Sequence, residues 1–179
     1  DESVRAVTSD GSPRWSTEAG FESCSWGYTS VHDLEGDGRP ELFLETHVMD
    51  ATTGEAQFLL ESCPIGEEAL AVGDLDLDGT QEIVQCTTVY DADGTARWSV
   101  DTGEPYMTYP VLVQADTDPE AEVVFIGTVI RVFDTDGTLL AASPPAGGPG
   151  SAGPPCAGDL DGDGRMEVTW ADMTALFAY

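Results

Sequence analysis

The amino-acid sequence predicts an all-β protein built from a repeated unit of short antiparallel strands. Three observations support this fold class. Two landmarks recur with one period, short β-branched and aromatic runs alternate with Asp-Gly turns, and no window shows sustained helical periodicity. The composition fits a folded chain, because 41% of the 179 residues are hydrophobic.

The first landmark is an acidic loop, and the second is a glycine turn. Four acidic segments align: HDLEGDGRPELFLET from His32, GDLDLDGTQEIVQCT from Gly73, VQADTDPEAEVVFIG from Val113 and GDLDGDGRMEVTWAD from Gly158. The turns place glycines at positions 11, 54, 94 and 137, with steps of 40 to 43 residues. Because both landmarks share one period, we interpret the chain as a true internal repeat.

Each repeat is predicted to contain four strands. In the second repeat the predicted strands cover residues 70–72, 82–87, 89–90 and 96–100, with a turn at Asp93-Gly94. Four short strands in ~40–45 residues match the size of one β-propeller blade. We therefore expect one domain over residues 1–179, a β-propeller of four four-stranded blades. The repeats cover approximately residues 18–60, 61–103, 104–143 and 156–179.

The last repeat is too short for four strands, and residues 1–17 offer the missing outer strand. Three arrangements remain open. A closed four-blade ring is completed by residues 10–17, or the chain is part of a larger propeller of about seven or eight blades. In the third arrangement the unpaired edges join neighbouring copies head to tail by strand exchange. The Pro- and Gly-rich segment 143–155 is predicted to be an inter-blade loop.

Three acidic loops share the pattern D-x-[DE]-x-D-G-x-x-E, and we number their positions one to nine. They are the first loop (residues 33–41), the second loop (74–82) and the fourth loop (159–167). Alternate carboxylates of a tight loop can converge on one centre, and Ca²⁺ prefers such oxygen ligands. An EF-hand is excluded, because position twelve holds Leu44, Gln85 or Trp170 instead of Glu.

The candidate metal ligands include the backbone carbonyl at position seven. They are Asp33, Glu35, Asp37, Arg39 and Glu41; Asp74, Asp76, Asp78, Thr80 and Glu82; and Asp159, Asp161, Asp163, Arg165 and Glu167. The third loop (114–122) departs from the pattern, because Gln114 stands at position one and Pro119 at position six. Its candidate ligands are Gln114, Asp116, Asp118 and Glu122. We expect three Ca²⁺ ions, with weaker or absent binding at the third loop.

The string GDLDGDGRMEV, with an apolar strand before it and a DG-x-x-x-W segment in the following turn, resembles the FG-GAP or VCBS repeats of integrin-α-like β-propellers. The resemblance covers almost the whole chain. It implies that structural calcium lies in the loop between the first two strands of each blade. It also implies a role in adhesion, in carbohydrate binding or as an accessory domain of a larger secreted protein. The third loop departs from the family pattern at Gln114 and Pro119.

Charge and cysteine content limit the partners and the location. The chain has 34 acidic residues against six arginines and a formal net charge of −28, which excludes nucleic acid and anionic lipid as partners. No apolar run is long enough for membrane insertion. The even cysteine count predicts disulfides and a secreted or cell-surface protein. Three pairings are possible, and a bridge between Cys24 and Cys63 is conceivable because both follow Glu-Ser.

We do not expect an enzyme, because His32 and His47 are the only histidines and no serine lies in a nucleophile-elbow motif. The aromatic residues at positions 15, 58 and 98 recur at one point of the repeat, which favours packing between blades. Candidates for an exposed binding face are Trp26, Tyr28, Tyr106 and Tyr109.

The expected function is a calcium-stabilised extracellular binding or structural module, acting in adhesion or assembly. Its partner would be a protein, a carbohydrate or copies of itself. The alternatives are a lectin-like carbohydrate-binding module, the non-catalytic part of a secreted polysaccharide-active enzyme, and a self-assembling subunit.

Overall fold

In the computed structural model every regular element of the described residues is a β-strand. The structure describes residues 3–17, 29–63, 69–103, 108–143, 154–163, 166–171 and 176–178. Within these ranges seventeen strands form five antiparallel sheets, which confirms the predicted all-β class. The same ranges contain no helix able to cross a membrane.

Three sheets have four strands each, in an up-and-down order that follows the sequence. The first sheet contains β3 (Thr29–His32), β4 (Glu41–Leu44), β5 (His47–Asp50) and β6 (Ala56–Leu59). The second contains β7 (Leu70–Gly73), β8 (Glu82–Gln85), β9 (Thr88–Tyr90) and β10 (Ala96–Ser99). The third contains β11 (Tyr109–Val113), β12 (Glu122–Ile126), β13 (Ile130–Phe133) and β14 (Leu139–Ser143). These sheets lie within the repeat ranges 18–60, 61–103 and 104–143.

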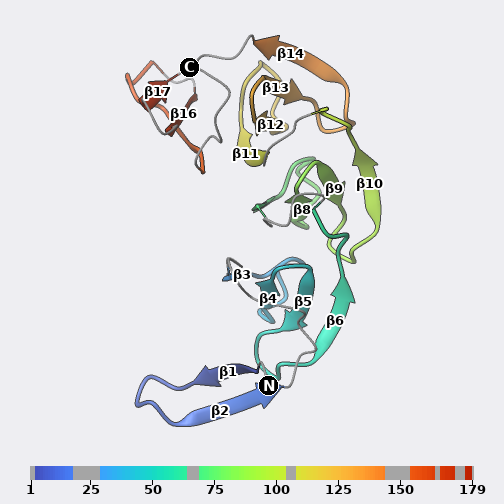
Figure 1. The fold of residues 1–179 in the computed structure, drawn as a ribbon, viewed down its shortest axis with the longest axis vertical. Coiled ribbons are helices and arrows are strands. Elements are labelled where there is room, and N and C mark those ends of the chain that lie inside the picture. Colours follow the sequence, from blue (N-terminus) through green and yellow to red (C-terminus); the bar gives the residue numbers. More distant parts are fainter. Residues whose placement is uncertain are drawn as a thin grey trace.

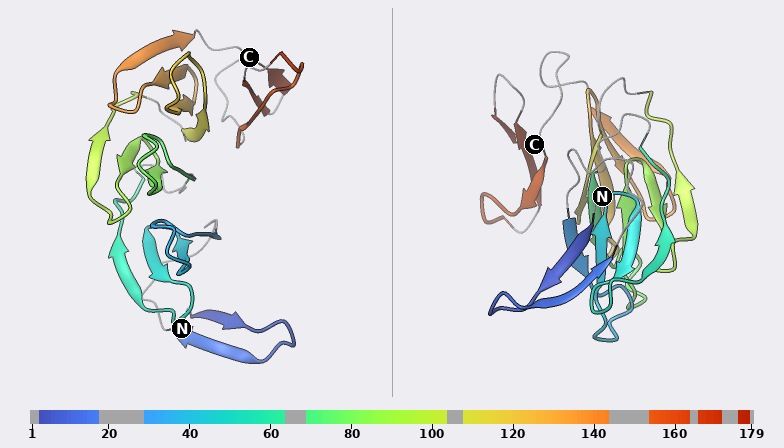
Figure 2. Two further views of the ribbon diagram at one scale, coloured as in Figure 1. Left: turned by 180° about the vertical axis from the view of Figure 1, so that it is seen from behind. Right: turned by 60° about the horizontal axis from the view of Figure 1, so that its bottom comes forward.

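Shorter sheets occupy the two ends of the described structure. The N-terminal hairpin consists of β1 (Val4–Val7) and β2 (Pro13–Thr17), and the fourth sheet consists of β15 (Cys156–Gly158), β16 (Glu167–Ala171) and β17 (Leu176–Ala178). Figure 1 shows the sheets following one another around an open arc, with the N-terminal hairpin at one end and the fourth sheet at the other. Strands β6, β10 and β14 line the convex side, and the view from behind in Figure 2 shows the same crescent.

The closed four-blade ring is not found in this structure. β2 pairs with β1, in a register that runs from Val4 opposite Thr17 to Val7 opposite Pro13, and it does not complete the fourth sheet. The local pairing is favoured because a hairpin needs little loop closure. The hairpin is also held in place, since Val4 packs against Leu44 and Met49 of the first sheet.

The sheets stack face to face, so the second strand of each inner sheet is covered on both sides. In β8, Ile83 packs in a cluster with Phe43 of the first sheet, whereas the next residue, Val84, packs with Phe125 of the third. Successive side chains of a strand point to opposite faces. All residues of β8 and β12 are therefore buried, and the four residues that follow Glu122 in β12 form a continuous apolar run.

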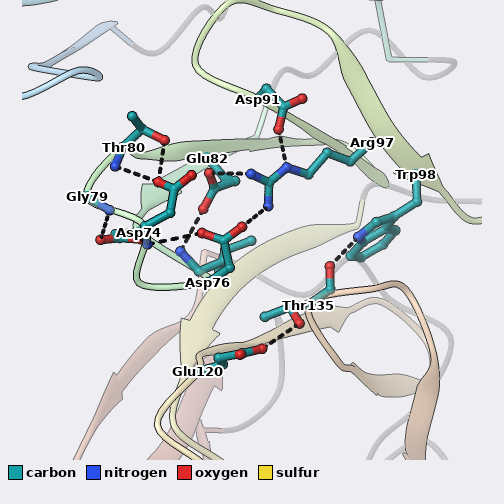
Figure 3. Close-up of polar contacts among 12 residues, drawn as sticks. Asp74, Asp76, Gly79, Thr80, Glu82, Asp91, Arg97, Trp98, Glu120 and Thr135 are labelled. Atoms are coloured by element: carbon teal, nitrogen blue, oxygen red, sulfur yellow. Dashed lines mark hydrogen bonds and ion pairs between the residues drawn. The ribbon is translucent and has the colours of Figure 1, made fainter.

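Aromatic side chains of the outer strands connect each sheet to the turn of the next one. The Trp15 ring lies over Gly54 and its indole N–H donates to the Ala51 carbonyl at 3.1 Å. Trp98 repeats this contact two junctions further along, where its indole N–H donates to the Thr135 carbonyl at 2.7 Å (Figure 3). Phe58 covers Gly94 between the first and second sheets. The predicted packing of these aromatic residues between repeats is confirmed.

The disulfide joins Cys63 to Cys86, so the Cys24–Cys63 pairing that the sequence suggested is wrong. Cys86 follows β8 in a turn conformation with a φ of 57°, and its Cα lies 5.7 Å from that of Cys63. This separation lies in the normal range for a bridge. Cys156 is a free, exposed thiol, and Cys24 lies outside the described residues.

Reduction of this disulfide is expected to lower the free energy of unfolding by about 3 kcal/mol, because the bridge closes a loop of 23 residues in the unfolded chain. Urea unfolding with and without dithiothreitol, in a Cys156→Ser background, measures the effect. The matched control is the additional double variant Cys63→Ser/Cys86→Ser, whose midpoint should not respond to the reductant. Mass spectrometry verifies that the bond is reduced. If the urea midpoint of the Cys156→Ser protein is then unchanged, the prediction is contradicted.

Candidate metal centres

Each acidic loop connects the first and second strands of its sheet. The glutamate at position nine begins the second strand, and one of its carboxylate oxygens accepts the backbone N–H of position two in all four loops. The donor–acceptor distances are 3.0 Å for Leu34 N to Glu41 Oε2, 2.7 Å for Leu75 N to Glu82 Oε2 and 2.7 Å for Leu160 N to Glu167 Oε2, and the third loop has the contact between Ala115 N and Glu122 Oε2. This bond closes the base of each loop.

Aspartates at positions one and five fold the first and second loops inward. Both oxygens of Asp74 accept N–H groups at 3.1 Å, from Asp78 and Gly79. Asp33 makes the equivalent contacts at 3.0 and 2.8 Å. The N–H of Thr80 donates to Asp78 at 2.8 Å, and the Thr80 hydroxyl, which also donates to it, holds the pKa of Asp78 below its ordinary value. Backbone donors thus order the carboxylates within these loops.

The third loop reaches a similar shape with different contacts. Pro119 has no N–H at position six, so a carboxylate at position one would lose one of its two donors. Gln114 occupies that position instead, and its side-chain N–H donates to the backbone carbonyl of Asp118. The two departures from the loop pattern therefore compensate for each other. Positions three, five and nine keep their carboxylates.

Within the described residues, three groups of carboxylates are close enough to hold a metal ion. In each group the ligand oxygens lie within 4.8 Å of one another. The groups are Asp74, Asp76 and Asp78; Asp116, Asp118 and Glu122; and Asp159, Asp161 and Glu167. The predicted set is thus gathered in part at the second, third and fourth loops, and no ion is identified by this geometry.

The first loop does not bring three carboxylates that close together, although all of its residues are described. Its position three is Glu35, one methylene longer than the aspartate of the other loops. Burial, followed by repulsion from Glu41, raises the pKa of Glu35. Arg39 at position seven donates its N–H to Asp37 at 2.8 Å. Arg165, the corresponding residue of the fourth loop, lies outside the described residues.

Arg97 reaches the second loop from the outer strand β10, and the sequence analysis did not identify this residue. Its guanidinium lies 2.8 Å from Asp76 Oδ2 and 3.0 Å from Glu82 Oε1, and it also contacts Asp91 (Figure 3). The available sequence signal was an arginine in the outer strand of one acidic repeat. Only the sheet register shows that this position faces the loop.

Glu122 of the third loop is fully buried, and only one of its two carboxylate oxygens has a hydrogen-bond partner. Its Oε2 accepts the Ala115 N–H, whereas Oε1 has no hydrogen-bond partner. Burial is the main cause of its raised pKa, and Asp116 adds to it by repulsion. Glu82 in the second loop is equally buried, but its Oε1 pairs with Arg97. The two loops therefore differ in how their buried glutamate is neutralised.

The predicted aromatic binding face is not supported where the structure describes it. Tyr109 is only 8% exposed, because β11 packs between neighbouring sheets, so its assignment to an exposed face is wrong. Trp26, Tyr28 and Tyr106 lie outside the described residues. His32 packs edge-on against Phe43, with ring centroids 5.6 Å apart.

No family model and no curated protein matches this chain. Among solved structures, the biofilm matrix protein Bap1 of V. cholerae is similar, with a TM-score of 0.62 and 19% identity over 74% of this chain and 23% of that chain. A rhamnogalacturonan lyase PL11 of Bacillus licheniformis gives a TM-score of 0.55 and 19% identity over 93% of this chain and 38% of that chain. BBS1N, whose structure was solved in complex with ARL6DN, gives a TM-score of 0.58 and 12% identity over 84% of this chain and 52% of that chain. The chain spans less than two thirds of each, and at these identities the likeness supports the fold alone.

Proposed function

We propose that this chain is a calcium-stabilised structural or binding module of an extracellular protein, with its sheets acting as blades of an FG-GAP/VCBS-like β-propeller. One observation carries the proposal. The same inter-strand loop occurs in four consecutive sheets, and in three of them it gathers three carboxylates within 4.8 Å. Such groups repel one another unless a cation lies between them.

Calcium suits these loops better than magnesium does. Ca²⁺ accepts six to eight oxygens at about 2.3–2.6 Å in irregular geometry, whereas Mg²⁺ requires a small octahedron and retains its water molecules. The ligands would be Asp116, Asp118 and Glu122 in the third loop, and Asp159, Asp161 and Glu167 in the fourth. When bound, calcium would neutralise the carboxylates. The chain itself positions these groups by the N–H contacts described above.

The Cys63–Cys86 bridge supports an extracellular setting, because disulfides persist in oxidising compartments. The proposal uses the acidic clusters of the third and fourth loops as metal ligands and assigns them no catalytic role. We therefore favour a non-enzymatic role, with a protein, a carbohydrate or further copies of the chain as the partner.

Calorimetric titration of the chelator-treated chain tests the metal proposal. Ca²⁺ is expected to bind with a dissociation constant of about 10⁻⁴ M or below, and Mg²⁺ is expected to bind at least about tenfold more weakly. Equal binding of both ions, or no binding heat and no change in melting temperature with Ca²⁺, would refute the proposal.

The calcium effect is expected to weaken as pH falls from 7.5 to 5. Burial raises the pKa of Glu122, so its protonated form favours the folded, metal-free chain below that pKa, and this contribution is lost as pH rises. Calcium needs the ionised form, so protons compete with it at mildly acidic pH. The difference in melting temperature between calcium-loaded and chelated protein should therefore shrink in this interval. A constant difference would contradict the prediction, and Glu122→Gln is the control that should respond less to pH.

A further inference from the structure

We propose that the guanidinium of Arg97 is the resident cation of the second loop, which therefore needs no divalent ion, and that the third loop takes calcium through its unpaired Glu122. The calcium part rests on the proposed function. The assignment of Arg97 rests on the contacts in Figure 3.

Arg97 contacts two of the carboxylates that would bind a metal at the second loop. It contacts positions three and nine through Asp76 at 2.8 Å and Glu82 at 3.0 Å, and the Glu82 side chain is fully buried. The third contact, with Asp91, fixes the guanidinium from the other side. Calcium would have to approach the same oxygens to about 2.3–2.6 Å. Metal and guanidinium therefore compete for Asp76, the residue that the contacts of Arg97 share with the group of Asp74, Asp76 and Asp78.

A β-bulge in the outer strand places Arg97 toward the loop. The register of β10 against β9 shifts between Ala96 and Trp98, so Arg97 is the extra residue of the bulge. The same shift occurs in the first and third sheets, where the extra residues are Gln57 and Leu140. The equivalent position is therefore neutral and polar in the first sheet (Gln57), cationic in the second (Arg97) and apolar in the third (Leu140).

In each of these three sheets, the side chain at the bulge determines whether the Oε1 atom of the position-nine glutamate has a partner. Gln57 donates to Glu41 Oε1 at 3.4 Å, and Arg97 binds the corresponding oxygen of Glu82. Leu140 has no donor to offer, and Glu122 Oε1 has no partner. A buried carboxylate oxygen without a partner is strongly unfavourable unless a cation satisfies it.

The third loop supplies what a cation would need. Glu122 is grouped with Asp116 and Asp118, with ligand oxygens within 4.8 Å of one another. The replacements at Gln114 and Pro119 keep this group together, because they exchange one set of loop contacts for another. The loop that looks degraded in sequence is therefore, among the first three sheets, the one whose position-nine glutamate has a carboxylate oxygen without a partner.

Calcium stoichiometry of the full chain tests the inference by calorimetry, with Tb³⁺ luminescence as a second readout. Glu122→Gln is expected to remove one site, whereas Glu82→Gln should leave the number of sites unchanged. Arg97→Gln, which copies the residue of the first sheet, should add one site, with at least about tenfold tighter calcium binding at the second loop than in the parent chain. Circular dichroism in saturating calcium verifies folding, and Asp116→Asn is the second variant for the third loop.

The outcomes separate the two proposals. If the parent chain binds no calcium, the proposed function fails and the third-loop assignment fails with it. If the parent chain binds calcium but Glu82→Gln removes a site and Arg97→Gln adds none, only the inference about Arg97 is overturned. If neither Glu122→Gln nor Asp116→Asn removes a site, the assignment of the third loop is overturned.

Discussion

Chelation of calcium is expected to lower the melting temperature by about 10 °C or more. A ligand at about a thousand times its dissociation constant stabilises the native state by about 4 kcal/mol per site. For a domain of this size, each kcal/mol shifts the melting temperature by about 2–4 °C. Loss of one site should therefore lower the melting temperature by about 8–16 °C, and loss of two sites should lower it by about twice as much.

The structural reason is the uncompensated charge that remains after metal removal. Six of the nine clustered carboxylates belong to the third and fourth loops, and Glu122 is fully buried. Differential scanning calorimetry with and without EDTA, at matched ionic strength, measures the effect. Sodium chloride is the control for screening, because salt screens buried pairs much less than exposed ones. If 1 M NaCl alone restores the melting temperature of the chelated protein, diffuse repulsion and not site-bound calcium controls stability.

Gly94→Ala is expected to destabilise the chain by about 3 kcal/mol, one of the largest effects of a single methyl group in this fold. Gly94 has a φ of 83°, which costs an alanine about 1 kcal/mol. The added Cβ would also lie 2.5 Å from the Phe58 ring, and overpacking costs about 1–3 kcal/mol more. Chemical denaturation followed by tryptophan fluorescence measures the change.

Gly11→Ala is the matched control, because Gly11 has a φ of 84° but no atom within 4 Å of an added Cβ. It should lose only the conformational part, about 1 kcal/mol. In a double-mutant cycle, Phe58→Ala should relieve part of the Gly94→Ala cost, since the clash disappears. Equal losses for the two glycine variants would show that the aromatic contact contributes nothing.

The sequence predicted the strands well because the repeat supplied several copies of each signal. In the second repeat the expected strand at 70–72 became β7 (Leu70–Gly73), and the one at 96–100 became β10 (Ala96–Ser99). The predicted strand at 82–87 ends early, because Cys86 adopts a φ of 57° in the turn before β9. The acidic loops could be placed between strands for the same reason, since an apolar run follows each of them and one also precedes the second and third loops.

Other features depend on contacts between distant residues, which no local pattern encodes. Arg97 lies 15 residues from Glu82 and meets it only because a bulge re-aims its side chain. The partner of Cys63 is set by where the turn at Cys86 lies in space. Tyr109 looked like a loop aromatic in sequence, but neighbouring sheets cover the strand that carries it. Ring closure depends on the curvature of the whole stack, which the repeat period does not determine.

The aromatic side chains that cover the neighbouring turns also predict how the molecule responds to force. Each junction up to the third sheet contains one aromatic ring that packs on the next turn, from Trp15, Phe58 or Trp98. The equivalent position of the third sheet is Ala141, which has no aromatic ring. When the chain is pulled at its two ends, every junction between sheets bears the same force, and the junction with the weakest contacts separates first. The arc is then expected to part between the third and fourth sheets at low force, while the three sheets before that point extend only at higher force.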